Sequence, residues 1–274
     1  MQFWLLLLLY ILLKGLPHVN WSFLTGKSSS YQAGGGIGIQ LYNSLFLLVI
    51  TLIISIPLSM GAGIYLSEYA KKGRFTNFIR TCIEILSSLP SVVVGLFGYL
   101  IFVVQFQYGF SIISGALALT VFNLPQMTRN VEDGLRNVHH TQREAGLALG
   151  LSRWETVVHV VVPEALPSIV TGIVLASGRI FGEAAALIYT AGQSAPALDW
   201  SNWNPLSVTS PISIFRQAET LAVHIWKVNS EGTIPDATQV SQGSAAVLLV
   251  FILIFNLSAR YIGKKLHAKL TSAN

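Results

Sequence analysis

Long apolar stretches alternate with short polar ones along the 274-residue chain. A transmembrane helix needs about 20 mostly apolar residues. The first apolar stretch is shorter, but it lacks the preceding basic residues and the small-residue cleavage site of a signal peptide, so we interpret it as a membrane helix. The pattern predicts an all-α membrane protein with one domain over residues 1–274 and about six transmembrane helices, at residues 1–16, 41–66, 81–104, 111–128, 163–190 and 245–262.

The composition agrees with this reading. The chain is 52% hydrophobic and 11% charged, whereas soluble domains are about 25% charged. The net charge of +5 could suggest nucleic-acid binding, but the basic residues gather after the second and fourth predicted helices and in the tail, which the positive-inside rule places in the cytoplasm. They are Lys71, Lys72, Arg74, Arg80, Arg129, Arg136, Arg143, Arg153, Arg260, Lys264, Lys265 and Lys269. We therefore expect a multi-pass protein of the cell (inner or plasma) membrane, embedded in the lipid bilayer, with a cytoplasmic C-terminus and no nucleic-acid partner.

The long segment 191–243 then lies outside the cell. Within it, apolar residues at helical spacing predict a short interfacial helix over residues 212–227: Phe215, Ala218, Leu221, Ala222 and Ile225. Such a helix would cap the external mouth, or it would dock an external partner.

The cytoplasmic loop 129–157 has the signals of a folded element. Thr141 and Ser152 each stand three residues before a glutamate, the capping-box pattern of a helix start. Gly150 lies between them, where a helix that ends in a left-handed conformation favours glycine. These signals predict a helix over 142–149, a turn at Gly150 and a second helix from Arg153 that leads into the fifth span. On propensity alone this knob could be purely structural.

Arg179 and Glu183 lie deep in the fifth apolar stretch. A charge at that depth costs at least about 2.5–3.5 kcal/mol, so it faces a partner or a cavity. At a spacing of i and i+4 the two side chains would share one helix face and could pair. The pair would then either join two helices or offer the forked arginine to an anion.

Further pathway candidates lie around the third span. Glu84 is either a boundary charge or a pathway group. Pro90 interrupts the helix, and a broken helix exposes backbone groups, so Ser87, Ser88 and Ser91 are weak candidates. Gly178 and Gly182 form a G-x-x-x-G pair that would pack against another helix.

No cofactor is expected on this chain. The sequence Gly26-Lys27-Ser28 matches the end of a phosphate-binding loop, but Trp21 occupies the place of its first glycine. The histidines are scattered, which predicts no metal site, and Cys82 is expected to be inert packing.

The loop 129–157 also resembles a known family. Glu144-Ala145-Gly146, Gly150 and Pro163 have the spacing of the EAA signature of ABC importer permeases. Gly146 replaces the usual second alanine. The resemblance implies the type I ABC importer permease fold, with a cytoplasmic coupling helix that docks on two separate ATPase subunits, which bind ATP and Mg. It assigns ATPase coupling to Arg143, Glu144, Ala145, Gly146, Gly150 and Pro163.

Three further runs resemble the PstA-type permeases of ABC phosphate importers: Ile64–Ala70, Leu89–Gly98 and Gly178–Glu183. The resemblance covers about residues 41–191. It implies a permease subunit that translocates inorganic phosphate into the cell by alternating access, with Arg179 and Glu183 in the substrate pathway. The implied partners are a homologous second permease and an extracellular or periplasmic phosphate-binding protein. Such a subunit is not itself an enzyme.

Other functions are also compatible with the sequence. The same architecture would serve another oxyanion, such as sulfate, molybdate or tungstate. An ion-gradient-driven transporter would need no ATPase, and a membrane scaffold would transport nothing.

Overall fold

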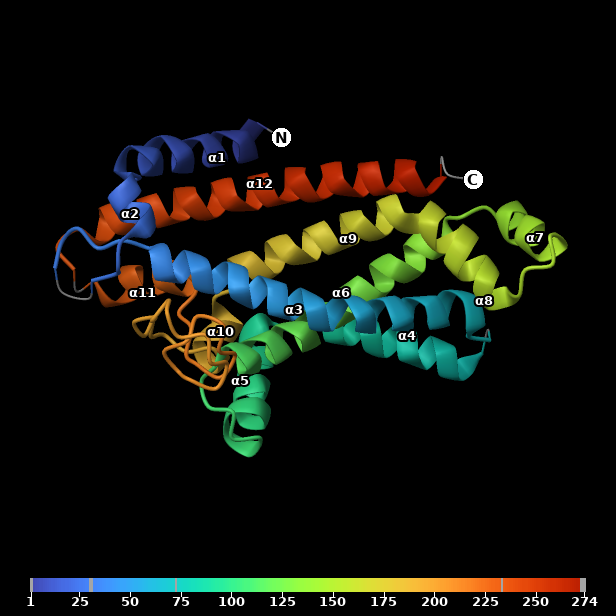
Figure 1. Ribbon diagram of the computed structural model, residues 1–274, viewed down its shortest axis with the longest axis horizontal. Helices are drawn as coiled ribbons and strands as arrows, with labels where there is room; N and C mark the ends of the chain where they lie inside the picture. The colour runs from blue at the N-terminus through green and yellow to red at the C-terminus, as the bar shows by residue number, and fades with distance from the viewer. Residues whose placement is uncertain (1, 30–31, 72, 233, 272–274) are drawn as a thin grey trace. The chain divides into compact units, whose positions relative to one another are not determined.

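The computed structural model describes residues 2–29, 32–71, 73–232 and 234–271, and within them the secondary structure is helical, with no strand (Figure 1). Lys72 of the predicted basic loop lies outside the described residues. η1 is a 3-10 turn, and η2, η3 and η4 are π-helical turns that continue α-helices. The elements are α1 (Gln2–Gly15), η1 (Leu16–His18), α2 (Trp21–Thr25), α3 (Gly38–Ile64), η2 (Tyr65–Tyr69), α4 (Arg74–Ser87), α5 (Ser91–Gly98), η3 (Tyr99–Gln105), α6 (Ile112–Arg136), α7 (His140–Ala148), α8 (Arg153–Thr156), η4 (Val157–Val161), α9 (Val162–Gly182), α10 (Ala185–Thr190), α11 (Leu221–Glu231) and α12 (Ala237–Thr271).

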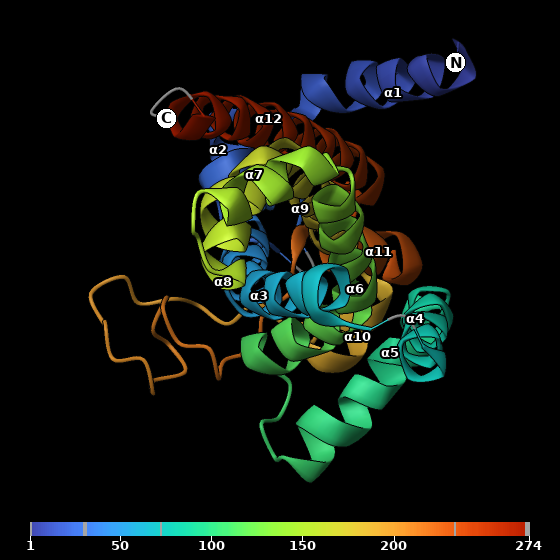
Figure 2. The same ribbon diagram turned by 90° about the vertical axis from the view of Figure 1, so that its right-hand side faces the viewer.

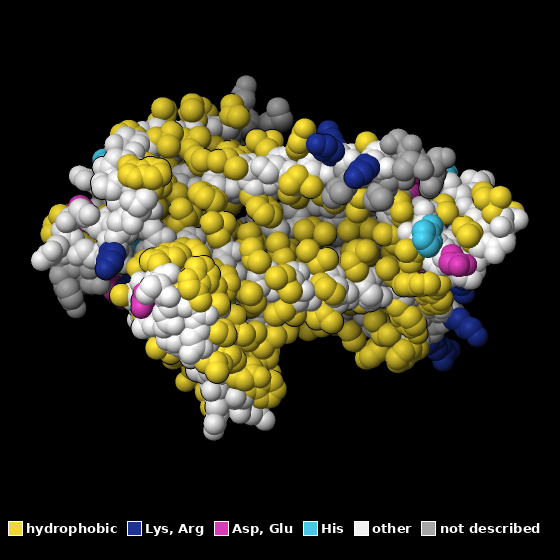
Figure 3. Space-filling view, viewed as in Figure 1, with side chains coloured by type: hydrophobic (Ala, Val, Ile, Leu, Met, Phe, Trp, Pro, Cys, Tyr) yellow, Lys and Arg dark blue, Asp and Glu magenta, His cyan; other side chains and the backbone are white. Residues whose placement is uncertain are grey.

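Three described helical segments are long and apolar enough to cross a membrane: Gly38–Tyr69, Arg153–Gly182 and Ala237–Lys269. A fourth span results if the bent pair α4 and α5–η3 is counted as one. Side chains along the middle of the long helices are largely hydrophobic in Figure 3, and Lys and Arg side chains lie toward the C-terminal part of α12 and around α4 and α8. The predicted count of six spans stays a prediction.

The predicted span 81–104 is not one straight helix. α4 ends at Ser87, α5 begins at Ser91, and the two are bent by 98°. Pro90 is the extended residue that precedes α5, and proline both lacks an N–H and disfavours helix in the residue before it. The interruption expected at Pro90 is confirmed, and the span over 81–104 stays a prediction.

The predicted span 163–190 is interrupted as well. α9 ends at Gly182, Glu183 and Ala184 are non-helical, and α10 begins at Ala185. The Glu183 carboxylate accepts a hydrogen bond from the Ala186 N–H at 3.1 Å. A side-chain acceptor at this place satisfies a backbone donor that a new helix start leaves free, which favours a restart over a continuous helix.

The helix predicted over 212–227 begins later than expected. Residues 212–220 are irregular, and α11 runs from Leu221 to Glu231. Thr220 caps its start by accepting from the Val223 N–H, and Gly232 closes it in the left-handed conformation (φ 57°). In Figure 2 the segment between α10 and α11 is an irregular orange trace. The sixth helix also starts earlier than residue 245, at Ala237, because hydropathy does not detect its polar first turns.

The chain divides into two compact units. The first unit comprises Met1–Thr51, Pro90–Leu119 and Arg179–Leu253. It contains an apolar core in which Phe23 and Ile37 pack with residues of α11 and α12.

The second unit comprises Leu52–Leu89, Thr120–Gly178 and Ile254–Asn274. Its core is formed by residues of α6, η4 and α9 together with Val138, which follows α6: Val131, Leu135, Val138, Val161, Ala165 and Ile169. Gly134 of α6 lies against Ser168, and Gly172 of α9 lies so close to Asn130 that a Cβ would approach its side chain to 2.7 Å. Small residues thus bring α6 and α9 together.

Candidate functional site

The predicted knob is present as two helices, α7 and α8, and a glycine turn connects them. Gly150 follows α7 with φ 83°. The Gly150 N–H donates to the Leu147 carbonyl at 3.0 Å, and the Leu151 N–H donates to the Gly146 carbonyl at 3.2 Å. These two bonds form the Schellman ending of a helix. The turn predicted at Gly150 is confirmed.

One of the two predicted capping boxes is confirmed. Ser152 Oγ accepts from the Glu155 N–H at 3.3 Å, and Glu155 Oε2 accepts from the Ser152 N–H at 2.8 Å. The box predicted at Thr141 is wrong, because α7 already begins at His140 and its N-cap, His139, makes no side-chain cap bond. Thr141 therefore lies inside the first turn, and α7 is two residues longer at its start than predicted.

Gly146 has a packing role. A Cβ on this residue would lie 2.8 Å from Thr156 Cγ2 and 3.1 Å from Thr156 Oγ1. Gly146 itself is buried. At this position α7 approaches α8 so closely that the alanine usual in the EAA signature would clash with Thr156. The contact therefore requires glycine.

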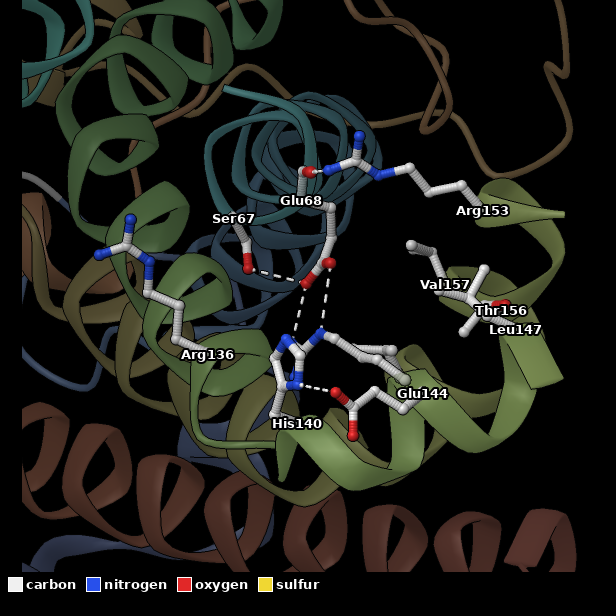
Figure 4. Close-up of a pocket in the computed structure, with 11 residues that line it drawn as sticks. Ser67, Glu68, Arg136, His140, Glu144, Leu147, Arg153, Thr156 and Val157 are labelled. Atoms are coloured by element: carbon white, nitrogen blue, oxygen red, sulfur yellow. Dashed lines mark hydrogen bonds and ion pairs between the residues drawn. The ribbon is translucent and has the colours of Figure 1, made fainter. Parts of the chain in front are cut away.

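The knob is anchored to the end of α3 through Glu68 in η2. Arg143 of α7 grips the Glu68 carboxylate with two bonds, Nη2 to Oε1 at 2.9 Å and Nε to Oε2 at 3.3 Å. Arg153 of α8 donates to the Glu68 backbone carbonyl, and its guanidinium lies 4.8 Å from the centre of the Tyr69 ring. Figure 4 shows Arg153 reaching Glu68, whose carboxylate also accepts from Ser67.

The end of α6 is held by the same arginine. Arg143 Nη1 donates to the Val138 carbonyl and Nη2 to the Leu135 carbonyl, both at 2.6 Å. Leu135 lies in the last turn of α6, where carbonyls lack partners within the helix, and Val138 follows two residues after the helix ends. Arg143 thus joins three elements of the second unit.

The outer face of the knob is exposed. The Glu144 side chain is 64% exposed and pairs with His140 Nδ1 at 3.1 Å. Ala145 is exposed too, as are the apolar side chains of Leu147, Leu149 and Trp154. An exposed apolar face rimmed by charge is typical of a protein interaction site.

A cavity of about 660 Å³ separates the knob from η2 and α6. Its wall includes Glu68, Arg143 and Arg153 from the anchor, together with apolar side chains of α7 and η4. Pro163, the last coupling residue predicted, follows directly on the π-helical turn η4, inside the continuous helical segment Arg153–Gly182. Its carbonyl lies 3.1 Å from His267 Nδ1 of α12.

The predicted pathway residues do not form one cluster on one helix face. Arg179 is exposed near the end of α9, and Glu183 lies beyond the end of that helix. The expectation that helical i,i+4 spacing places both on one face is wrong, because the helix ends at Gly182.

The remaining pathway candidates make local contacts. Glu84 pairs with Arg129 at 3.0 Å. The hydroxyls of Ser87 and Ser88 donate to the carbonyls of Glu84 and Ile85, at the end of their own helix. These residues belong to the second unit, whereas Ser91, Arg179 and Glu183 belong to the first.

The first unit contains a buried polar cluster that the sequence did not predict. Glu219 Oε2 accepts from Gln40 Nε2 at 2.9 Å, and Oε1 lies 3.1 Å from His224 Nδ1. Arg216 is 1% exposed and donates to Asn43 Oδ1 at 2.8 Å. Burial lowers the pKa of Arg216 to about 10, so it stays charged at neutral pH. The cluster holds the irregular segment on the first turns of α3, and the polar residues in that apolar helix are its only sequence signal.

Comparison with known proteins identifies the fold and the family. A family model described as "Binding-protein-dependent transport system inner membrane component" matches residues 55–271. The chain belongs to this family. It is a multi-pass membrane permease of an ABC importer, and the family is not one of enzymes.

Individual relatives confirm the resemblance to PstA-type permeases. The "Probable ABC transporter permease protein YqgI" of Bacillus subtilis is 56% identical over 263 residues, which span 96% of this permease and 90% of the relative. The "Phosphate transport system permease protein PstA" of Yersinia pestis is 34% identical, with 97% and 86% of the two chains covered. PstA 2 of Mycobacterium bovis is 33% identical, with 93% and 80% covered.

Solved structures confirm the type I ABC importer permease fold. A chain of the inward-facing MetNI methionine ABC transporter aligns with a TM-score of 0.60 at 16% identity, over 84% of this permease and 94% of that chain. A chain of an amino acid ABC transporter aligns with a TM-score of 0.55, over 82% and 92%. At this identity the likeness concerns the fold alone.

Proposed function

We propose that this permease translocates inorganic phosphate into the cell. The observation that carries the proposal is the similarity to phosphate transport permeases along nearly the whole chain, at 33–34% identity. The run Gly178–Glu183, which contains Arg179 and Glu183, also supports phosphate as the substrate, because it resembles the corresponding run of phosphate permeases. Phosphate moves by alternating access, as separate ATPases close and open around ATP.

The exposed knob supports the proposed coupling to ATPase partners. Two cytoplasmic ATPase subunits, which bind ATP and Mg, dock on the outer face of α7 and α8. A homologous second permease completes the pathway, and an external phosphate-binding protein delivers the anion. This arrangement places the C-terminus in the cytoplasm, in agreement with the basic residues of the tail.

Arg179 binds the anion in this proposal. Its guanidinium is permanently charged and forked, so it matches two oxygens of a phosphate. The exposed position near the end of α9 leaves it accessible within the single chain. Glu183, at the helix break, accepts a hydrogen bond from protonated phosphate, a contact that fully ionised sulfate cannot make.

The test uses the complete complex reconstituted in liposomes. Phosphate-loaded binding protein should stimulate ATP hydrolysis, and stimulation by sulfate, molybdate or tungstate in place of phosphate would overturn the proposal. Arg179→Ala should abolish phosphate uptake while both ATPases still co-purify with the complex. Arg74→Ala, which changes an exposed arginine of the cytoplasmic loop, is the matched control and should transport normally. Normal uptake by Arg179→Ala would remove Arg179 from the pathway.

A further inference from the structure

Glu68 occupies an unusual place for a carboxylate. It lies in η2, the π-helical turn that continues α3 into one helical segment, Gly38–Tyr69. Its side chain is only 9% exposed. A carboxylate buried to this degree requires a partner, because an unpaired buried charge is strongly destabilising.

Both helices of the knob meet at this residue. The α7 arginine, Arg143, grips the Glu68 carboxylate through a forked pair of bonds, and its own side chain is 18% exposed. The α8 arginine, Arg153, holds the Glu68 backbone carbonyl. A forked arginine–carboxylate pair fixes orientation as well as distance. A displacement of α7 or α8 is therefore transmitted to η2.

Glu144 of α7 lines the same cavity as Glu68, and it differs from Glu68 in its exposure. Its side chain is 64% exposed, and it pairs with the neighbouring His140 on the same helix. Figure 4 shows the His140–Glu144 pair apart from the contact between Arg153 and Glu68. The knob thus carries one exposed glutamate, Glu144, and is held to the helical segment Gly38–Tyr69 by a buried one, Glu68.

The cavity beside the anchor increases the importance of these contacts. About 660 Å³ lies between the knob, η2 and the end of α6. Where such a space replaces close packing, force passes through the groups that bridge it. Arg143 bridges it to Glu68 and to the carbonyls of Leu135 and Val138.

We propose that Glu68 is a positioning residue for coupling: through Arg143 and Arg153 it makes α3 follow every movement of the ATPase-docked knob. The inference rests on the proposed coupling to ATPases, and it is independent of which anion is carried. Without the carboxylate the knob still docks, but α3 no longer moves with it.

The direct test measures whether the knob and η2 move as one body. Spin labels are attached at the exposed positions Thr141 of α7 and Tyr65 of η2 in a background that carries Cys82→Ala, which removes the single native cysteine. In the assembled complex, the distance distribution between the labels should be narrow and unchanged by ATP. Glu68→Gln, which keeps the side-chain shape and removes the charge, should broaden it and make it shift when ATP binds.

The functional arm uses the same complexes. Glu68→Gln should lower the anion transported per ATP hydrolysed by at least 10-fold, while ATP hydrolysis and co-purification of the ATPases persist. Asp133→Asn, which removes an exposed carboxylate of α6 in the same unit, should leave both measurements unchanged. If Glu68→Gln does not fold, Arg143→Lys, which keeps the charge but loses the fork, should give the same uncoupling.

The outcomes separate this inference from the proposed function. A distance distribution and a transport ratio in Glu68→Gln that match the unsubstituted complex would overturn the role of Glu68. If phosphate fails to stimulate the unsubstituted complex, the assigned anion is wrong, yet the label distances still decide whether Glu68 transmits motion.

Discussion

The contact between Gly146 and Thr156 yields the sharpest prediction about the knob. Replacing Gly146 by alanine restores the residue usual in the EAA signature, and in a helix interior this change alone favours the helix by about 1 kcal/mol. The new Cβ would lie 2.8 Å from Thr156 Cγ2, whereas carbon atoms in contact prefer about 3.5–4.0 Å. Thr156 cannot turn away freely, because its Oγ1 donates to the Ser152 carbonyl at 3.0 Å.

The clash outweighs the gain in helix propensity. Overpacking a close contact costs about 1–3 kcal/mol, so Gly146→Ala should destabilise the junction of α7 and α8 by about 0–2 kcal/mol after the propensity gain of about 1 kcal/mol. Thr156→Ser removes the methyl group that clashes and keeps the hydroxyl, at a cost of about 0.8 kcal/mol for the lost apolar group. The double variant should therefore be nearly as stable as the original chain, and the two changes should couple favourably by about 1–3 kcal/mol.

Hydrogen–deuterium exchange at the Gly150 and Leu151 amides measures this stability, because both amides donate to α7 carbonyls. Exchange should accelerate up to about 30-fold in Gly146→Ala, since 1.4 kcal/mol corresponds to about a factor of 10 in the opening equilibrium. It should return close to the original rate in the double variant. Exchange that is slower in Gly146→Ala, or equally fast in the single and double variants, would refute the contact as the reason for glycine.

Two further predictions test local structure. Ser152→Ala should destabilise the start of α8 by about 1 kcal/mol and accelerate hydrogen exchange of the Glu155 amide. Thr141→Ala is the control and should not change exchange in α7, because the Thr141 side chain does not cap that helix. Equal effects of the two substitutions would contradict the single capping box. Arg216→Met should leave Asn43 Oδ1 without its buried donor, which costs about 1–3 kcal/mol, and limited proteolysis should then cleave residues 211–220 faster. Arg216→Lys should not restore protection because it lacks the fork, and unchanged cleavage in Arg216→Met would exclude the anchoring role.

Features set by neighbouring residues could be predicted from the sequence. The left-handed turn at Gly150 and the capping box at Ser152 depend on local hydrogen bonds, and the structure contains both. Three of the predicted apolar spans fall in helices long and apolar enough to cross a membrane. The break at Glu183 was missed because its signal is a single carboxylate that caps a new helix in an otherwise apolar run. The start of α11 was missed because apolar residues with helical spacing extend into the irregular segment before it.

Contacts distant in sequence could not be predicted. Arg143 and Glu68 are 75 residues apart, and Gln40 and Glu219 are 179 residues apart. Neither pair has a periodicity or motif that joins its members. The sequence marked Arg143 through the EAA signature, but its buried partner followed an apolar span and resembled an ordinary boundary charge.

The basic residues that the positive-inside rule assigns to the cytoplasmic side contribute to a topology signal and to buried ion pairs, two roles that the sequence alone did not separate. Arg80 and Arg136 both bind Glu132 Oε1, at 2.8 and 2.9 Å, and Glu132 is 6% exposed. Arg143 binds Glu68 in the same way. These arginines contribute to the positive-inside signal, yet each ends on a buried carboxylate of the second unit. In the predicted topology their charge orients the chain during insertion, and in the folded chain it pairs with carboxylates of the second unit. A neutral substitution at Arg80 or Arg136 would leave an incompletely paired buried glutamate, so a transport defect in such a variant does not by itself indicate altered topology.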